Sequence, residues 1–94
     1  MALLNEATLV VPTAQGSTAT VTGTVAAFRD ADGWWATLVA PAESVPSRAE
    51  VVGQRAQITA QPSAAWARVT DCVTLLATTP TVQLVLRGEG EAPF

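Results

Sequence analysis

The stretch from Thr18 to Val39 constrains the fold of this chain more than any other. Its first half alternates threonine with small apolar residues, the threonines being Thr18, Thr20, Thr22 and Thr24. Successive side chains of a β-strand point to opposite faces, so this alternation predicts a strand with its threonines outward and its valines and alanines inward. Gly23, in the middle of the run, predicts a bulge or a close backbone approach. A second apolar run follows the turn residues 30–33, and the two runs together predict a long β-hairpin.

The turn end of this hairpin carries its aromatic residues. If residues 30–33 form the loop, Arg29 faces Trp34 on one side of the hairpin. Phe28 then faces Trp35 on the other side. Large apolar groups therefore lie on both sides near the turn, which a strand with one buried face does not need. Further along, the same register predicts the pairs Val25–Leu38, Ala27–Ala36 and Thr24–Val39.

Short extended runs separated by turn residues continue through the rest of the chain. The turn residues gather at 12–17, 41–47, 61–64 and 78–80. Between them Ala, Thr and Val predominate, and the stiff side chains of Thr and Val favour strands. A length of 94 residues gives room for one core. We therefore predict an all-β fold over residues 1–94, a small single-domain barrel or sandwich of five to six antiparallel strands.

The two ends of the chain carry their own expectations. The first run stops at Pro12, which has no N–H to donate to a ladder, so residues 1–12 are expected as an edge strand or as an arm that reaches a neighbouring subunit. Residues 88–94 are rich in Gly and Glu and are expected as a flexible acidic tail. The aromatic Phe94 closes this tail and could dock on another surface.

The stretch after Pro62 fits both a helix and a strand. Ser63 is a suitable N-cap for a helix. Apolar residues recur at helical spacing, namely Trp66, Val69, Val73 and Leu76. Several of these residues are β-branched, however, which favours a strand. We expect a short helix near 63–68, followed by a strand over 69–77. The order of the expected elements then resembles the layout of the OB-fold, a small barrel with a helix after its third strand.

The charged residues narrow the class of partner. The chain has five basic residues, all of them Arg, against eight acids, and its net charge is -3. Nucleic-acid binding needs clustered cations, and the arginines are scattered along the sequence, so nucleic acid is not the expected partner. A membrane surface also requires a polybasic face. The chain shows neither the pattern of a signal peptide nor about 20 consecutive apolar residues, so we expect a cytoplasmic protein, or a virion component if the chain is viral.

Residues that could carry catalysis or hold a metal ion are few. The chain has no His and no Lys, which excludes the common nucleophilic triads, and its single cysteine, Cys72, is expected as a small buried hydrophobic residue. Asp30, Asp32 and Gly33 depart from the spacing of a calcium loop and suit a hairpin turn. Residues 88–91 are acidic and would repel phosphate. We therefore expect no enzyme activity, no catalytic residue, no cofactor and no metal.

Recognition of another molecule remains. Trp35 with Phe28 is expected to form an exposed apolar patch, which marks an interface on a small domain. Arg29 and Arg68 stand beside tryptophans and could serve as interface partners. The predicted protein interface consists of Phe28, Arg29, Trp35 and Phe94.

Several functions are compatible with such an interface. The one we expect is a structural or assembly protein, for example a small virion accessory subunit such as a capsid decoration, head–tail or tail component of a phage. Such a protein would act through protein–protein contacts, as a homo-oligomer or within a larger assembly. The alternatives are an OB-like binding module or a bacterial adaptor. OB domains often bind single-stranded nucleic acid through aromatic side chains and a basic groove, and only the aromatic residues are evident here.

Overall fold

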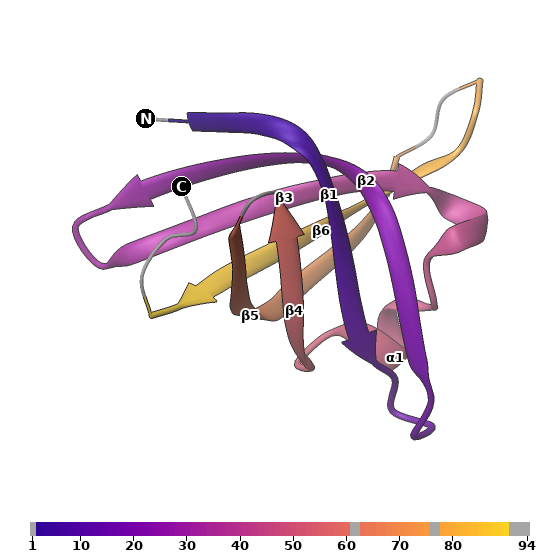
Figure 1. Cartoon of the computed structure of the whole chain (residues 1–94). Helices are drawn as coiled ribbons and strands as arrows, with labels where there is room; N and C mark the ends of the chain where they lie inside the picture. The colour runs from indigo at the N-terminus through magenta and orange to yellow at the C-terminus, as the bar shows by residue number, and fades with distance from the viewer. Residues whose placement is uncertain (1, 61–62, 76–77, 91–94) are drawn as a thin grey trace.

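The computed structural model describes residues 2–60, 63–75 and 78–90, which form a closed antiparallel β-barrel (Figure 1). Its six strands are β1 (Ala2–Pro12), β2 (Thr18–Asp30), β3 (Gly33–Pro41), β4 (Arg55–Ala60), β5 (Ser63–Leu75) and β6 (Thr81–Glu89). Two single turns of helix, η1 (Ala42–Ser44) and α1 (Arg48–Val51), lie between β3 and β4. The all-β fold is confirmed, and of the two expected architectures the barrel is the one observed.

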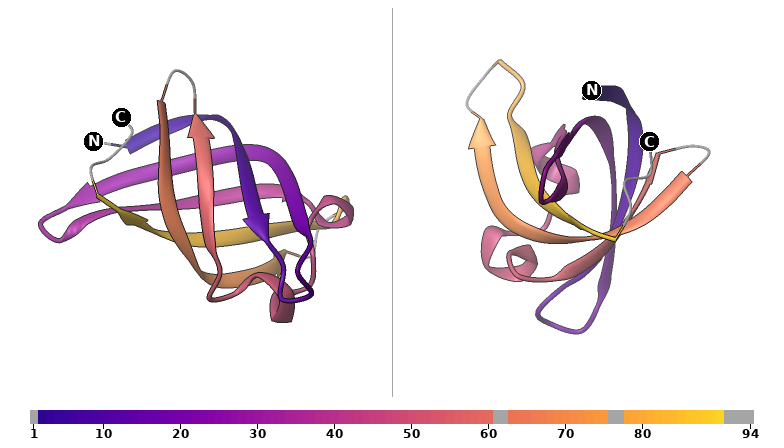
Figure 2. Two further views of the ribbon diagram at one scale, coloured as in Figure 1. Left: turned by 60° about the horizontal axis from the view of Figure 1, so that its bottom comes forward. Right: turned by 90° about the vertical axis from the view of Figure 1, so that its left-hand side faces the viewer.

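The barrel consists of two three-stranded meanders joined across one end. Its strand order is β1-β2-β3-β6-β5-β4, and β4 closes the barrel by pairing with β1 at residues 8–10. The connection from β3 to β4 carries both helical turns and packs the side chain of Val51 into the barrel. The turn between β2 and β3, the start of β1 and the end of β6 lie together at the opposite end (Figure 2). The barrel has one strand more than the five of the OB-fold.

The alternation expected in β2 is confirmed. The four threonines Thr18, Thr20, Thr22 and Thr24 are exposed, whereas Val21, Val25 and Ala27 are buried. The side chains that face the barrel interior in this way include Trp34, Leu9, Leu38, Leu84, Leu86, Val11 and Val69. They form the apolar core, whose removal from water stabilises the fold.

The expected register of the β2–β3 hairpin is also confirmed. Arg29 pairs with Trp34 and Phe28 with Trp35, and the further pairs follow as expected. The Asp30 carboxylate accepts a hydrogen bond from the N–H of Asp32 at 2.9 Å, which holds the tight turn.

Gly23 allows two strands to approach closely. A Cβ at this position would lie 2.1 Å from the carbonyl oxygen of Val39 on the neighbouring strand, a distance at which a side chain does not fit. The close backbone approach expected at Gly23 is thus observed.

The expected short helix near 63–68 is wrong. Residues 63–75 form the continuous strand β5, which pairs with β4 on one side and with β6 on the other. Ala67 and Val69 are buried, whereas Trp66 and Arg68 are exposed, so the stretch has a period of two residues. The helical spacing of its apolar residues was a coincidence. Pairing with strands on both sides satisfies the backbone of this segment and outweighs the local pattern.

Both ends of the described chain are strands. Residues 2–12, expected as an edge strand or arm, form β1, which pairs along its whole length with β2. At the other end β6 extends to Glu89, so the barrel includes the first two residues of the expected tail. Residues 91–94, including Phe94, lie outside the described residues. No helix in the described part of the chain is long and apolar enough to cross a membrane.

Candidate functional site

A row of large side chains crosses the outer face of the barrel near the β2–β3 turn. It follows direct cross-strand pairs through five strands, in the order Phe28, Trp35, Arg87, Arg68 and Arg55. Directly paired residues of an antiparallel sheet project from the same face. None of these five side chains is buried, whereas their chain neighbours Trp34, Ala67 and Leu86 are. The row therefore lies on the outside.

Two aromatic rings form one end of this row. The rings of Phe28 and Trp35 stack with centroids 4.5 Å apart and an interplanar angle of 26°. Both residues are half-buried. A stacked pair of this kind contributes about 0.5–1.5 kcal/mol beyond its area burial.

A third aromatic residue lies beside the row, next to its arginines. Trp66 is two residues before Arg68 on β5 and is 43% exposed. The guanidinium of Arg55 lies 4.2 Å from the centre of its ring, which is the geometry of a cation–π contact. The Arg55 Nε also donates to the Glu89 carboxylate, at 3.1 and 3.2 Å. We call the surface made by Phe28, Trp35, Arg87, Arg68, Arg55 and Trp66 the aromatic–arginine strip.

The three adjacent arginines are an unfavourable arrangement for folding, because like charges directly opposite each other on a sheet destabilise it. The outer two are paired with acids: Arg87 with Asp30 at 3.1 Å, and Arg55 with Glu89 at 3.1 Å. The Arg87 guanidinium holds the pKa of the Asp30 carboxyl below its ordinary value. Arg68, in the centre, donates instead to the carbonyl oxygen of Gly53 at 2.7 Å. Among the described residues no carboxylate forms an ion pair with it.

Behind the strip the barrel is tightly packed. Trp34 is 1% exposed and lies against Gly88 of β6. A Cβ at Gly88 would lie 1.9 Å from the Cε2 atom of the indole, so only glycine fits there without movement of the ring. Trp35 and Arg87 are the chain neighbours of these two residues. Trp35 and Arg87 of the strip therefore lie directly beside closely packed core residues.

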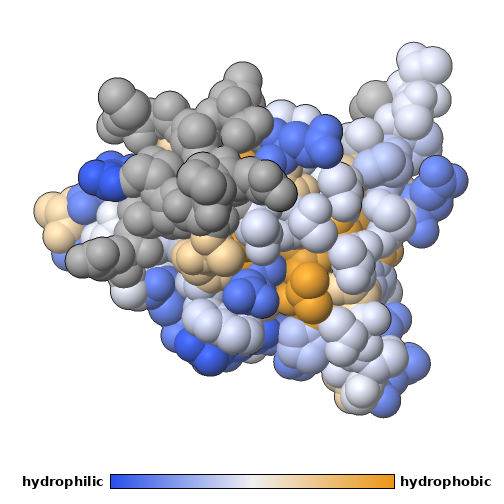
Figure 3. Space-filling view, viewed as in Figure 1, coloured by the Kyte–Doolittle hydropathy of each residue, from blue (hydrophilic) through white to orange (hydrophobic). Residues whose placement is uncertain are grey.

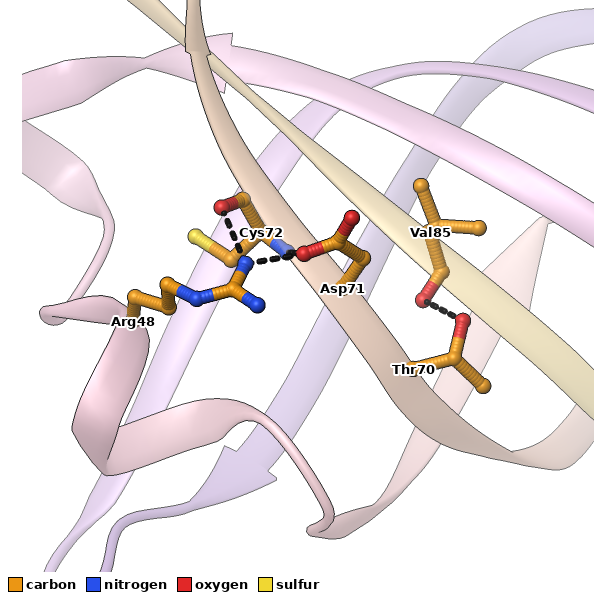
Figure 4. Close-up of polar contacts among 5 residues, drawn as sticks. All are labelled: Arg48, Thr70, Asp71, Cys72 and Val85. Carbon is orange, nitrogen blue, oxygen red and sulfur yellow. Dashed lines mark hydrogen bonds and ion pairs between the residues drawn. The ribbon is translucent and has the colours of Figure 1, made fainter.

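A second polar cluster lies where β5 continues past the start of β4 (Figure 4). The Arg48 guanidinium forms an ion pair with Asp71 and donates to the carbonyl oxygen of Cys72 at 3.0 Å. The Asp71 carboxylate also accepts the N–H of Cys72 at 2.9 Å. The ion pair thus satisfies both backbone groups of Cys72, as a neighbouring strand would do. Its role is to cap a strand edge.

The neighbouring residues explain the geometry of this edge. The pairing of β5 with β6 shifts between Val69 and Asp71, which leaves Thr70 as the extra residue of a β-bulge. The Thr70 hydroxyl donates to the carbonyl oxygen of Val85 at 3.1 Å (Figure 4). Cys72 is buried, as expected, and desolvation raises the pKa of its thiol, which suppresses the thiolate needed for a nucleophile.

One pocket lies among the described residues at the end of β3. This pocket of about 280 Å³ is lined by Pro41, Ala42, Glu43, Thr79 and Pro80. Its lining offers the single carboxylate of Glu43, the hydroxyl of Thr79 and no cationic side chain. Within the described ranges no group of three or more Cys, Asp or Glu residues is placed to hold a metal ion.

The predicted interface residues separate in the structure. Phe28 and Trp35 lie together on the strip. Arg29 is exposed but pairs with Trp34, so it lies on the other side of the hairpin, and Phe94 is outside the described residues. Their part in an interface stays a prediction.

Sequence reasoning missed the assembly of the strip. Arg55, Arg68 and Arg87 are distant in the sequence, and the error at 63–68 placed Arg68 in a helix. The alternation of polar and apolar residues around Arg55 and around Arg87 would have placed these two arginines on the outer face. Their adjacency required the strand order.

Figure 3 shows one face with a small apolar area near its middle, surrounded by polar residues. The exposed large hydrophobic residues of the described chain are Val10, Trp66 and Val73. Comparison with protein families, with curated proteins and with solved structures finds no match for this chain.

Proposed function

We propose that this chain is a non-enzymatic assembly subunit that binds a protein partner through the aromatic–arginine strip. The observation that carries the proposal is the row of side chains itself, two stacked aromatics and three adjacent arginines on one outer face. Trp and Arg are enriched at protein interfaces and dominate their binding energy.

The three adjacent arginines oppose folding, and this cost supports a role for the strip in binding. Three of the five arginines stand opposite one another, where each contact between like charges opposes folding. The packing of Trp34 on Gly88 holds the strip in place before any partner arrives, which reduces the entropy lost on association.

The charges of the strip favour a larger assembly over a symmetric homodimer. A two-fold axis that runs along the strip would bring the arginines of one copy against those of the other. A heterologous contact with a different surface avoids that repulsion. The composition of the chain favours a virion as the larger assembly. If the protein is cellular, the alternative is a bacterial adaptor complex.

A second candidate function is binding of single-stranded nucleic acid. The arginines that are scattered in the sequence form one row in the fold, with Phe28 and Trp35 at one end and Trp66 beside it, and ssDNA-binding surfaces combine these groups. The acids Asp30 and Glu89 flank that row, however, and the net charge of the chain is -3. Both features repel phosphates, so the protein partner is the better supported proposal.

The proposal is tested by display selection of random linear peptides on the immobilised chain. We expect enriched peptides that lose binding when Trp35 and Trp66 are both replaced by Ser. Val73→Ser is the matched control, because Val73 is 42% exposed and lies off the strip. Circular dichroism must show that all variants are folded. The proposal is overturned if no peptide is enriched, or if the strip variant and the control bind the enriched peptides equally.

A further inference from the structure

We infer that the strip recognises an extended segment of the partner in which a single carboxylate, with apolar residues before and after it in the sequence, binds Arg68. This inference rests on the proposed function and names the chemistry of the partner. It excludes a purely apolar partner and a strand of nucleic acid.

The need for a carboxylate follows from the ion pairs of the strip. Asp30 occupies Arg87 and Glu89 occupies Arg55, whereas Arg68 between them donates to the backbone oxygen of Gly53. The described chain provides no carboxylate for this central arginine. A guanidinium presents five N–H donors, so Arg68 can keep its bond to Gly53 and still bind a carboxylate with its remaining N–H groups.

The number of charges distinguishes a peptide from nucleic acid. A nucleic-acid strand would place a phosphate beside Arg68 and further phosphates beside Asp30 and Glu89, which repel them. A peptide can place one carboxylate at Arg68 and no charge on either side. Since Asp30 and Glu89 pair with the two outer arginines, the charge of the strip fits a single acid at Arg68.

The aromatic side chains of the strip determine which residues of the peptide lie near its acid. Trp66 lies two positions from Arg68 along β5, about 6.7 Å, and Trp35 lies two strands away, about 9.6 Å. Alternate side chains of an extended peptide are about 6.7 Å apart. Apolar side chains about two to four positions from the acid can therefore reach the Trp66 ring in the direction along β5 and the Phe28–Trp35 stack in the direction across the strands.

The test measures the affinity of one strip-dependent peptide from the display selection by fluorescence anisotropy. We expect the enriched peptides to share one Asp or Glu flanked by apolar residues. Arg68→Gln should weaken binding about tenfold, as expected for the loss of a hydrogen bond between charged groups. Replacing the acid of the peptide by its amide should weaken binding by a similar factor. The two changes together should weaken it little more than either alone, because both remove the same contact.

Two controls accompany this cycle. Arg48→Gln changes the net charge by the same amount at the β5 edge, away from the strip, and should leave the affinity within about twofold. A labelled oligothymidylate should bind weakly at physiological salt, and Arg68→Gln should not change that binding.

Several results would overturn the inference. Strip-dependent peptides without an acid, or effects of the two changes that add independently, would leave the proposed function intact and remove the carboxylate from it. Tight binding of oligothymidylate that needs Arg68 would replace the peptide by nucleic acid. Self-association that Arg68→Gln abolishes, seen by light scattering while no peptide is enriched, would replace it by a second copy of the chain.

Discussion

The contact between Gly88 and Trp34 gives a sharp test of the core that supports the strip. A Cβ at Gly88 would lie 1.9 Å from Cε2 of the indole, and Trp34 is 1% exposed, so the added methyl group would have to displace a buried ring. Overpacking of a core costs about 1–3 kcal/mol, and we expect Gly88→Ala to cost about 3 kcal/mol, at the top of that range. A chain of this length has about 5–14 kcal/mol of stability, so the variant still folds but is clearly weakened.

A double-mutant cycle assigns that loss to the contact. Trp34→Leu alone should cost about 2–4 kcal/mol through lost burial. It also opens space beside Gly88, so adding Gly88→Ala to this background should cost close to nothing. The coupling between the two sites is then about 2–3 kcal/mol.

The assay is urea unfolding followed by far-UV circular dichroism, which does not depend on the tryptophan removed. The m-values should stay constant, so that midpoints report stability. If Gly88→Ala costs the same in both backgrounds, or costs nothing, the packing of Trp34 on Gly88 is not what holds this end of the barrel.

Three further predictions concern single positions. Arg68→Gln should change the stability by less than about 1 kcal/mol, because relief of like-charge repulsion offsets the lost hydrogen bond to the backbone; a large loss in urea unfolding would make the arginine structural. The ion pair with Arg48 holds the pKa of Asp71 below its ordinary value of 3.8, so its stabilising effect is complete above that value and is lost as the pH falls through the lowered pKa. Asp71→Asn should therefore flatten the fall in thermal stability below about pH 4, and an unchanged acid slope would contradict this role. Gly23→Ala should cost about 3 kcal/mol or more, because its Cβ meets the rigid carbonyl of Val39; a thermal melt like that of the unmodified chain would contradict the close approach.

The sequence was most informative where local pattern and turn chemistry agree. The alternation in β2 and the short turn before Trp34 determine each other, because a slip of one residue would bury threonines and expose valines. The register of this hairpin and the all-β class could therefore be predicted, whereas the choice between barrel and sandwich stayed open.

The sequence was least informative about β5. Its apolar residues also fit a helix, and only the strands on either side decide the matter. The same contacts bring Arg55, Arg68 and Arg87 together. Because a helix was predicted near 63–68, the position of Arg68 at the centre of the strip could not be predicted. A residue can be assigned to a face from its own neighbours in sequence, but adjacency between strands depends on the topology of the whole barrel.

The most direct test of the strip as the binding surface is amide chemical-shift mapping of the labelled chain with a peptide from the display selection. We predict that the largest changes lie at Trp35, Arg68, Trp66 and Arg87 and in the Trp35 and Trp66 indoles. Residues beside the pocket at Pro41 should change little. Largest changes at that pocket, or at the Arg48–Asp71 edge, would contradict the assignment of binding to the strip.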